Sequence, residues 1–138
     1  MTVDQVANAD LCYAPSYSDA MDNLITAANV ARNKLDDLVR GISAAEVHAM
    51  LDAKEDFIFL DVRSPREHEE VRLPGSRLIP LGSLRGRLHE LPREKLIVTF
   101  CDIGLRGYEA ALVLADAGFT DARMLDGGLT MWPYERIE

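Results

Sequence analysis

Cysteine is scarce in this sequence: the chain has two, Cys12 and Cys101, and no Cys-x-x-Cys pair or Cys/His cluster with the spacing of metal ligands. This scarcity excludes a disulfide-rich fold and argues against a zinc site. Long apolar runs are also missing, since no stretch approaches the roughly 18 residues of a membrane span. The first ten residues lack the basic and apolar segments of a signal peptide. We therefore expect a cytoplasmic protein that binds neither metal nor membrane.

Basic residues are outnumbered as well. The 138 residues include 15 Lys and Arg against 23 Asp and Glu, which gives a formal net charge of −8. This balance argues against non-specific binding to nucleic acid or to an anionic membrane, because both require a basic surface. The hydrophobic content of 48% is that of a globular protein. A chain of this length can bury a core without disulfide bonds.

Short apolar segments alternate with helical patterns along most of the chain. Strands are predicted at four apolar runs, FIFLDV (57–62), RLIP (77–80), LIVTF (96–100) and ARML (122–125). Helices are predicted over about 43–52, 64–70, 82–91 and 107–117, the last ending at Gly118, with a short closing helix after residues 127–128. This alternation predicts an α/β fold in which helices cover both faces of a parallel sheet. The domain should extend over residues 42–138.

Residues 1–41 lie outside this alternation. Apolar residues recur at helical spacing over about 20–40, which predicts a long amphipathic helix. Ser18 or Asp19 is the expected N-cap, and Gly41 is the expected end. The apolar stripe of this helix has no natural neighbour in the predicted domain. We expect it to pack against a second copy of the chain and form a homodimer.

The stretch VTFCDIGLRGYEA (98–110) places a thiol where a predicted strand passes into a predicted helix. Ligand chemistry in an open parallel sheet takes place at this end of the strands. The following helix directs its unpaired N–H groups and the positive end of its dipole towards Cys101, which favours a nucleophilic thiolate. Gly104 and Gly107 allow backbone amides to converge on an anion. Arg106 adds a fixed positive charge.

A simpler interpretation is that Cys101 packs as a small apolar residue. Free cysteines are often buried in this way. Without the neighbouring glycines and arginine this interpretation would be preferred, but their presence within six residues of the thiol favours a reactive cysteine.

The loop CDIGLRG (101–107), with a helix directly behind it, resembles the active-site loop of rhodanese-domain sulfurtransferases. Two further segments, DVRSPREHEEVRLPGSRLIPLGSL (61–84) and LDGGLTMW (125–132), resemble other motifs of that family in the same order. The resemblance covers residues 42–138 and implies a five-stranded parallel sheet flanked by helices, with Cys101 as the carrier of a transient persulfide. It also implies that the bound sulfur is surrounded by the loop residues Asp102, Ile103, Gly104, Leu105, Arg106 and Gly107.

The implied reaction is a double displacement with covalent catalysis. Cys101 takes a sulfane sulfur from thiosulfate, a polysulfide or a persulfide and passes it to a thiol or cyanide, without a metal or an organic cofactor. The loop from Cys101 to Arg106 has six residues, one fewer than in the related cysteine phosphatases, which argues against phosphatase activity. The alternative is a rhodanese module that is non-catalytic or depends on a partner.

Several residues outside the Cys101 loop are expected to have supporting or structural roles. Asp61 and Arg63 are predicted to form a structural ion pair or a cap near the edge of the active site, in a supporting role. Trp132 is predicted to anchor the closing helix in the core. The three histidines lie on separate helical segments, and none has sequence neighbours that would complete a catalytic triad. Solvated or packing roles are therefore expected for His48, His68 and His89.

The segment ADLCYAPSYSDAMDNLITAANVARNKL (9–35) resembles the C-terminal end of the dimerisation domain of flavin-dependent coenzyme A-disulfide reductases and related NADH oxidases. Some of those proteins carry a rhodanese domain at this position. The resemblance implies a flavoprotein reductase as a partner or as a further part of the same protein. Tyr13 would lie near the disulfide-reducing site of such an enzyme, whereas a catalytic role in these 138 residues is not expected. Cys12 is expected to pack.

Overall fold

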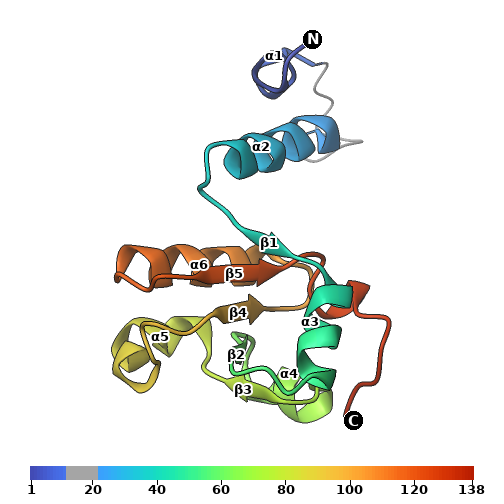
Figure 1. Cartoon of the computed structure of the whole chain (residues 1–138). Helices are drawn as coiled ribbons and strands as arrows, with labels where there is room; N and C mark the ends of the chain where they lie inside the picture. The colour runs from blue at the N-terminus through green and yellow to red at the C-terminus, as the bar shows by residue number, and fades with distance from the viewer. Residues whose placement is uncertain (12–21) are drawn as a thin grey trace. The chain divides into compact units, whose positions relative to one another are not determined.

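The computed structural model describes residues 1–11 and 22–138, which form two compact units, Met1–Leu38 and Val39–Glu138 (Figure 1). No described helix is long and apolar enough to cross a membrane. Four residues singled out from the sequence lie outside the described part: Cys12, Tyr13, Ser18 and Asp19.

The first unit begins with a short helix that the sequence pattern does not predict. Helix α1 (Val3–Ala7) starts at a capping box, in which the side chains of Thr2 and Gln5 bond to each other's backbone amides at 3.3 and 2.8 Å. With only five residues, α1 is too short to show an apolar repeat. Its cap is therefore the local signal that marks it.

Helix α2 (Asn23–Leu35) lies within the helix predicted over about 20–40, and it packs against α1. Its N-cap is Asp22, whose side chain accepts a hydrogen bond from the backbone at 2.7 Å. The helix ends earlier than predicted because Asp37 adopts a left-handed φ of 55°. Gly41, the predicted end of this helix, lies instead in a strand of the second unit.

The second unit is built on a five-stranded sheet whose neighbouring strands are all parallel, which confirms the predicted fold class (Figure 1). The strands follow the order β1-β5-β4-β2-β3 across the sheet. Four of the five coincide with predicted apolar runs, and β1 does not. Their bounds are β1 (Gly41–Ile42), β2 (Ile58–Asp61), β3 (Ser76–Leu78), β4 (Ile97–Phe100) and β5 (Ala122–Leu125).

The helices of this unit start and end close to the predicted positions. Ser43 and Ser64 both open helices through capping boxes, with Glu46 and Glu67 as their partners. Gly118 has a φ of 83° directly after the last long helix, as predicted for a C′ glycine. The helices are α3 (Ala44–Asp52), α4 (Pro65–Glu70), α5 (Leu81–Arg87) and α6 (Leu105–Asp116), and 3-10 turns follow at Leu88–Glu90 and Leu129–Met131.

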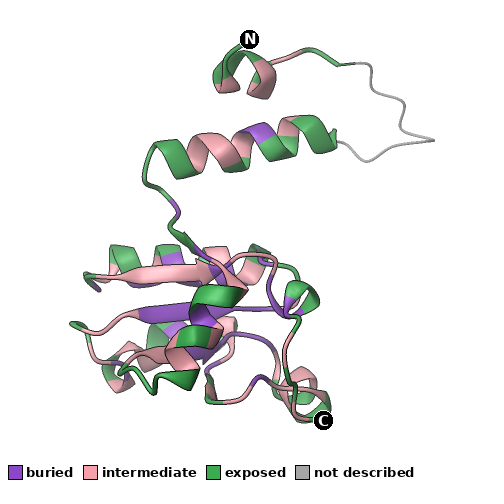
Figure 2. Ribbon diagram, turned by 45° about the vertical axis from the view of Figure 1, so that its right-hand side comes forward, coloured by how far each residue is buried: buried purple, intermediate pink, exposed green. Residues whose placement is uncertain are grey.

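Side chains alternate between the two faces of the central strands, so the sheet has a hydrophobic core on each side. One face packs against α5 and α6 and buries Leu60, Leu84, Ile97, Ala110 and Leu114. The other face packs against α3 and the last turn and buries Val47, Phe59, Val98, Phe100 and Trp132. The burial of Trp132 confirms its predicted anchoring role. Figure 2 shows buried residues along the central strand, whereas β5 is mostly intermediate in burial.

The carboxyl ends of β2 and β4 lie next to each other, because Asp61 pairs with Phe100 in the register of these parallel strands. The residues that follow, Val62 and Arg63 on one strand and Cys101 on the other, therefore emerge at the same edge of the sheet. Ligand sites in open parallel sheets form at this edge.

Candidate active site

Cys101 is the first residue after β4, and it is almost completely buried, with 1% of its surface exposed. Its Sγ accepts a hydrogen bond from the backbone amide of Gly104 at 3.2 Å. Gly104 is the N-cap of α6 and has a φ of 115°, a conformation that side-chain-bearing residues rarely adopt. The sulfur is thus held at the N-terminal end of a twelve-residue helix, where unpaired amides and the helix dipole stabilise negative charge.

Gly107 serves the site in a different way from the one predicted. It lies inside α6 and does not have a positive φ. A Cβ at this position would lie 3.3 Å from the Cα of Phe100, so the absence of a side chain lets the first turn of α6 rest directly on β4. The hydroxyl of Thr99 donates a hydrogen bond to the Gly107 carbonyl at 2.8 Å and fixes this contact. The role is close packing rather than backbone freedom.

The segment after β5 supports the start of the Cys101 loop. The backbone amides of Leu129 and Thr130 donate to the carbonyls of Cys101 and Asp102, both at 2.9 Å. These bonds require a close approach at Gly128, where a Cβ would collide with the same two carbonyl oxygens. Gly128, in a segment predicted only as a loop, therefore allows this chain segment to lie directly against the start of the Cys101 loop.

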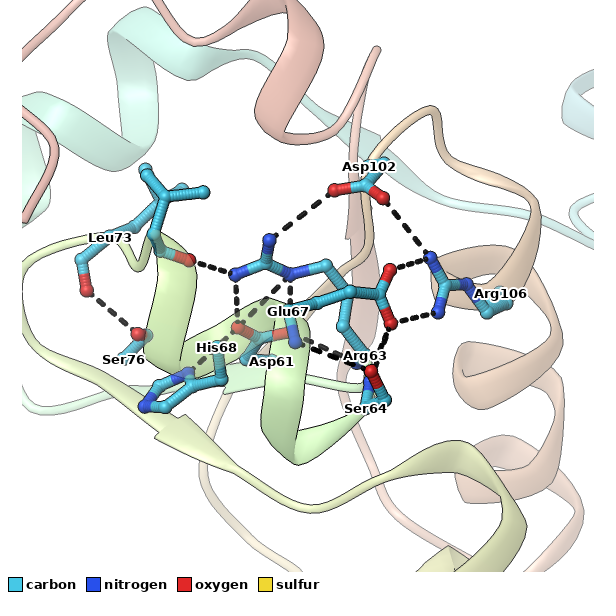
Figure 3. A network of polar contacts seen from close by, with 10 residues as sticks. Asp61, Arg63, Ser64, Glu67, His68, Leu73, Ser76, Asp102 and Arg106 are labelled. Atoms are coloured by element: carbon cyan, nitrogen blue, oxygen red, sulfur yellow. Dashed lines mark hydrogen bonds and ion pairs between the residues drawn. The ribbon is translucent and has the colours of Figure 1, made fainter. Parts of the chain in front are cut away.

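Arg63 is buried beside this loop and forms the predicted ion pair with Asp61 (Figure 3). Its guanidinium donates to the Asp61 carboxylate at 2.7 and 3.0 Å and to the Val71 carbonyl at 2.7 Å. A further bond at 3.3 Å reaches Asp102. Burial acts to lower the pKa of Arg63, but the hydrogen bonds and charges of Asp61 and Asp102 outweigh it and raise that pKa. The guanidinium is therefore a permanent cation in this network.

Arg106 is fixed by Glu67, a contact that the sequence does not reveal. Two nitrogens of the guanidinium donate to the two carboxylate oxygens of Glu67 at 2.7 and 3.0 Å, and a third contact at 3.3 Å reaches Asp102 (Figure 3). The hydrogen bonds from Arg106, and then that from Ser64, hold the pKa of Glu67 far below its usual range. The sequence indicates Glu67 only as an acid in the first turn of a helix, and its capping box with Ser64 accounts for its place there without pointing to Arg106.

His68 has a buried acidic neighbour, contrary to the expectation of a merely solvated or packing residue. Its Nδ1 lies 2.9 Å from a carboxylate oxygen of Asp61 (Figure 3). His48 does pack, as predicted, with its ring stacked on Tyr134 at 3.8 Å between centroids. His89 is exposed in the 3-10 turn after α5.

The loop residues predicted to surround sulfur differ in exposure. Gly104 and Gly107 are buried, and Asp102 and Arg106 are partly buried. The side chains of Ile103 and Leu105 point to solvent, with 72% and 62% of their surfaces exposed. These two residues can therefore offer an anion their backbone amides only. Within the part of the chain that the structure describes, no group of three or more His, Cys, Asp or Glu side chains could hold a metal ion.

Two solved structures are similar to nearly the whole chain. A NAD-dependent persulfide reductase from A. fulgidus shares 48% identity with a TM-score of 0.81, and 96% of this chain matches 23% of that protein. The reduced CoADR-RHD of Bacillus anthracis shares 34% identity with a TM-score of 0.88, again over 96% of this chain and 23% of that protein. The chain thus spans about a quarter of each of these larger proteins.

Other relatives match a shorter part of the chain. The probable adenylyltransferase/sulfurtransferase MoeZ of Mycobacterium tuberculosis is 34% identical over 93 residues, which cover 66% of this chain and 24% of that protein. The thiosulfate sulfurtransferase GlpE of Pseudoalteromonas translucida is 32% identical over 91 residues, or 66% of this chain and 86% of that protein. Residues 43–134 match the family described as the rhodanese-like domain. The chain therefore belongs to the rhodanese-like domain family, and its similarity over nearly its whole length connects it with the rhodanese domains of coenzyme A-disulfide reductase-type proteins.

Proposed function

We propose that this protein transfers sulfane sulfur through a persulfide on Cys101. The observation that carries the proposal is the Cys101 Sγ, which lies at the N-terminal end of α6 and accepts a hydrogen bond from the Gly104 amide. A thiolate and a persulfide are both anions, and the same amide and helix dipole stabilise each of them. The names of the relatives, which include sulfurtransferases and a persulfide reductase, support the same chemistry.

The reaction follows from the position of the sulfur. The Cys101 thiolate attacks the outer sulfur of the donor, a new S–S bond forms, and the donor's own S–S bond breaks to release sulfite or a thiolate. A thiol or cyanide then removes the outer sulfur and regenerates the Cys101 thiolate. The two steps exchange one sulfur atom between nucleophiles, so no external oxidant or reductant is needed.

Polysulfides and low-molecular-weight persulfides are the donors that we propose for this site, ahead of thiosulfate. The support is the similarity over 96% of the chain to proteins named as a persulfide reductase and a CoADR-RHD. A flavoprotein reductase, as a partner or as a preceding part of the same protein, fits these relatives. The cytoplasm, where thiols stay reduced, is the compartment that we propose for this chemistry.

The test is mass spectrometry of the protein after treatment with a polysulfide and, separately, with thiosulfate. We expect one added sulfur atom on the peptide that contains Cys101, and its removal by cyanide. The variant Cys101→Ser should take up no sulfur and should produce no thiocyanate. Equal thiocyanate production by the wild type and by Cys101→Ser with every donor would contradict the proposal.

Dependence on a partner is the second candidate, and the 1% exposure of Cys101 is the observation that favours it. A partner that moves the surrounding side chains would give a bulky donor access to the thiol. Under this alternative the isolated protein reacts slowly, and addition of a partner reductase increases the rate of persulfide formation. Phosphatase activity is disfavoured by the six-residue loop, and turnover of an aryl phosphate that depends on Cys101 would revive it.

We also propose that the exposed leucines at the two ends of α2 mediate a homodimer. Leu24 and Leu35 lie eleven residues, or about three turns, apart on this helix and are 57% and 75% exposed. Analytical ultracentrifugation at micromolar concentration should show a dimer, and Leu24→Glu combined with Leu35→Glu should shift it to a monomer. A wild-type protein that sediments as a monomer would show that these leucines do not drive association.

A further inference from the structure

The cations beside the Cys101 loop are already matched by carboxylates. Both terminal nitrogens of the Arg106 guanidinium donate hydrogen bonds to the Glu67 carboxylate, at 2.7 and 3.0 Å. One of them also contacts the Asp102 carboxylate. Arg63 is bonded to Asp61 and to the same Asp102. In this network two guanidinium groups face three carboxylates (Figure 3). An incoming anion therefore has to compete for a guanidinium that is already engaged.

Arg106 nevertheless belongs to the first turn of α6, the helix whose N-cap amide bonds the Cys101 sulfur. Its pKa is raised mainly by the hydrogen bonds that it donates to Glu67, and negative charge on Cys101 contributes in the same direction. Its side chain remains 36% exposed, so a ligand can reach it. The availability of this guanidinium to a donor thus depends on how firmly Glu67 holds it.

The exposed side chains of the loop favour a different kind of ligand. Ile103 and Leu105 flank Gly104, whose amide binds the sulfur, and both are largely exposed. Met131, which is 67% exposed, follows the two residues whose amides bond to the loop carbonyls. These side chains offer no hydrogen bond to an oxyanion, but they can cover an apolar stem attached to the sulfur.

We propose that Glu67 determines donor specificity: by occupying Arg106 it disfavours the small dianion thiosulfate and favours persulfides of uncharged thiols with an apolar stem. The inference rests on the proposed transfer of sulfur through Cys101. Thiosulfate brings two negative charges beside Glu67 and Asp102, and sulfite leaves with both of them. An alkyl persulfide transfers the same outer sulfur and leaves as a thiolate with a single charge. Cyanide then takes the sulfur from Cys101 as thiocyanate in either case.

The variant Glu67→Gln separates this role from the capping of α4. Gln is accepted at the third position of a capping box, as Gln5 demonstrates in α1. The substitution therefore keeps the cap with Ser64 and removes the negative charge from Arg106. A matched control is Glu46→Gln, which makes the same change in the capping box of α3.

The measurement is kcat and KM for thiosulfate and for the persulfide of an uncharged alkyl thiol, with cyanide as the acceptor for both donors. In Glu67→Gln the ratio of kcat/KM for thiosulfate to that for the persulfide should rise roughly tenfold, as expected for one charge in a partly exposed site. The rise should come from a lower KM for thiosulfate and should shrink in high salt. Glu46→Gln should keep the wild-type ratio.

A second variant, Asp102→Asn, removes the other carboxylate from Arg106 without touching a helix cap. In the wild type the contact between Arg106 and Asp102 is longer than those to Glu67, at 3.3 Å. The ratio of kcat/KM for thiosulfate to that for the persulfide should therefore rise by a smaller factor. This variant decides the question if Glu67→Gln does not fold. An unchanged ratio in both variants, or an equal loss with both donors, would overturn the role of Glu67 while leaving sulfur transfer through Cys101 in place. Failure of sulfur transfer itself is recognised separately, because wild type and Cys101→Ser would then behave alike.

Discussion

The variant Gly128→Ala is expected to lose about 100-fold in the rate of sulfur transfer, the size of effect that follows from a reacting group displaced by about 1 Å. The methyl group would collide with the carbonyls of Cys101 and Asp102, the second at 2.7 Å. The alanine backbone would also have to adopt the φ of 57° and the ψ of −152° that Gly128 has. Both effects push the thiol away from the segment that holds it. We expect a loss of about 2–4 kcal/mol in the free energy of unfolding, measured by urea denaturation.

Gly75→Ala provides the matched control for this prediction. Gly75 has a similar φ of 74°, but the nearest atom to its Cβ would be a terminal methyl of Leu51 at 3.1 Å. This variant should cost about 1–2 kcal/mol of stability because of its left-handed backbone, and its rate of sulfur transfer should match the wild type. If Gly128→Ala and Gly75→Ala lose the same stability and keep the same rate, the carbonyl collision does not control the position of Cys101.

Arg63→Met is expected to be the most destabilising change in the network. It would leave the carboxylate of Asp61, which has no exposed surface, without its cationic partner and with the ring nitrogen of His68 as its remaining side-chain contact in the network. Removal of one partner from a buried ion pair costs about 3–5 kcal/mol. For a domain of this size such a loss lowers the melting temperature by roughly 15–25 °C. Differential scanning calorimetry measures the shift.

Two further variants test whether the buried charge is the cause. Combining Arg63→Met with Asp61→Asn removes the unpaired charge, so the double variant should be more stable than Arg63→Met alone. Arg66→Met removes an arginine whose side chain is 88% exposed and pairs with Glu70, and it should change stability by less than about 1 kcal/mol. A double variant that is less stable than Arg63→Met would contradict this explanation.

Elements with a strong local signal could be predicted from the sequence. Strands β2 and β4 are continuous apolar runs because they are covered on both faces. The caps at Ser43 and Ser64 and the glycine at Gly118 marked helix ends correctly. The position of Cys101 at the start of the β4–α6 loop followed from these elements, since the thiol directly follows a strand that could be recognised.

The rest depends on contacts between distant parts of the chain. Strand β1 has two residues and becomes a strand only through its pairing with β5. The bonds from Arg106 to Glu67 and from Arg63 to Asp102 each join residues 39 positions apart. Neither the hydrophobic periodicity nor a helix cap indicates a contact between residues so far apart in the sequence. The sequence predicted Arg106 as a fixed positive charge beside the thiol, and it did not indicate that the folded chain pairs this charge with the Glu67 carboxylate.

The strand order has a consequence for the dynamics of the site. Strand β4 is the middle strand of five, and all four of its residues are buried. Amides in such a strand exchange their hydrogens only when most of the domain opens, whereas short edge elements such as β1 open locally. Because Cys101 directly follows β4, the proposed nucleophile is attached to the part of the sheet that should open last. Hydrogen exchange in α4, which contains no buried residue, should be much faster than in the strand that carries the thiol.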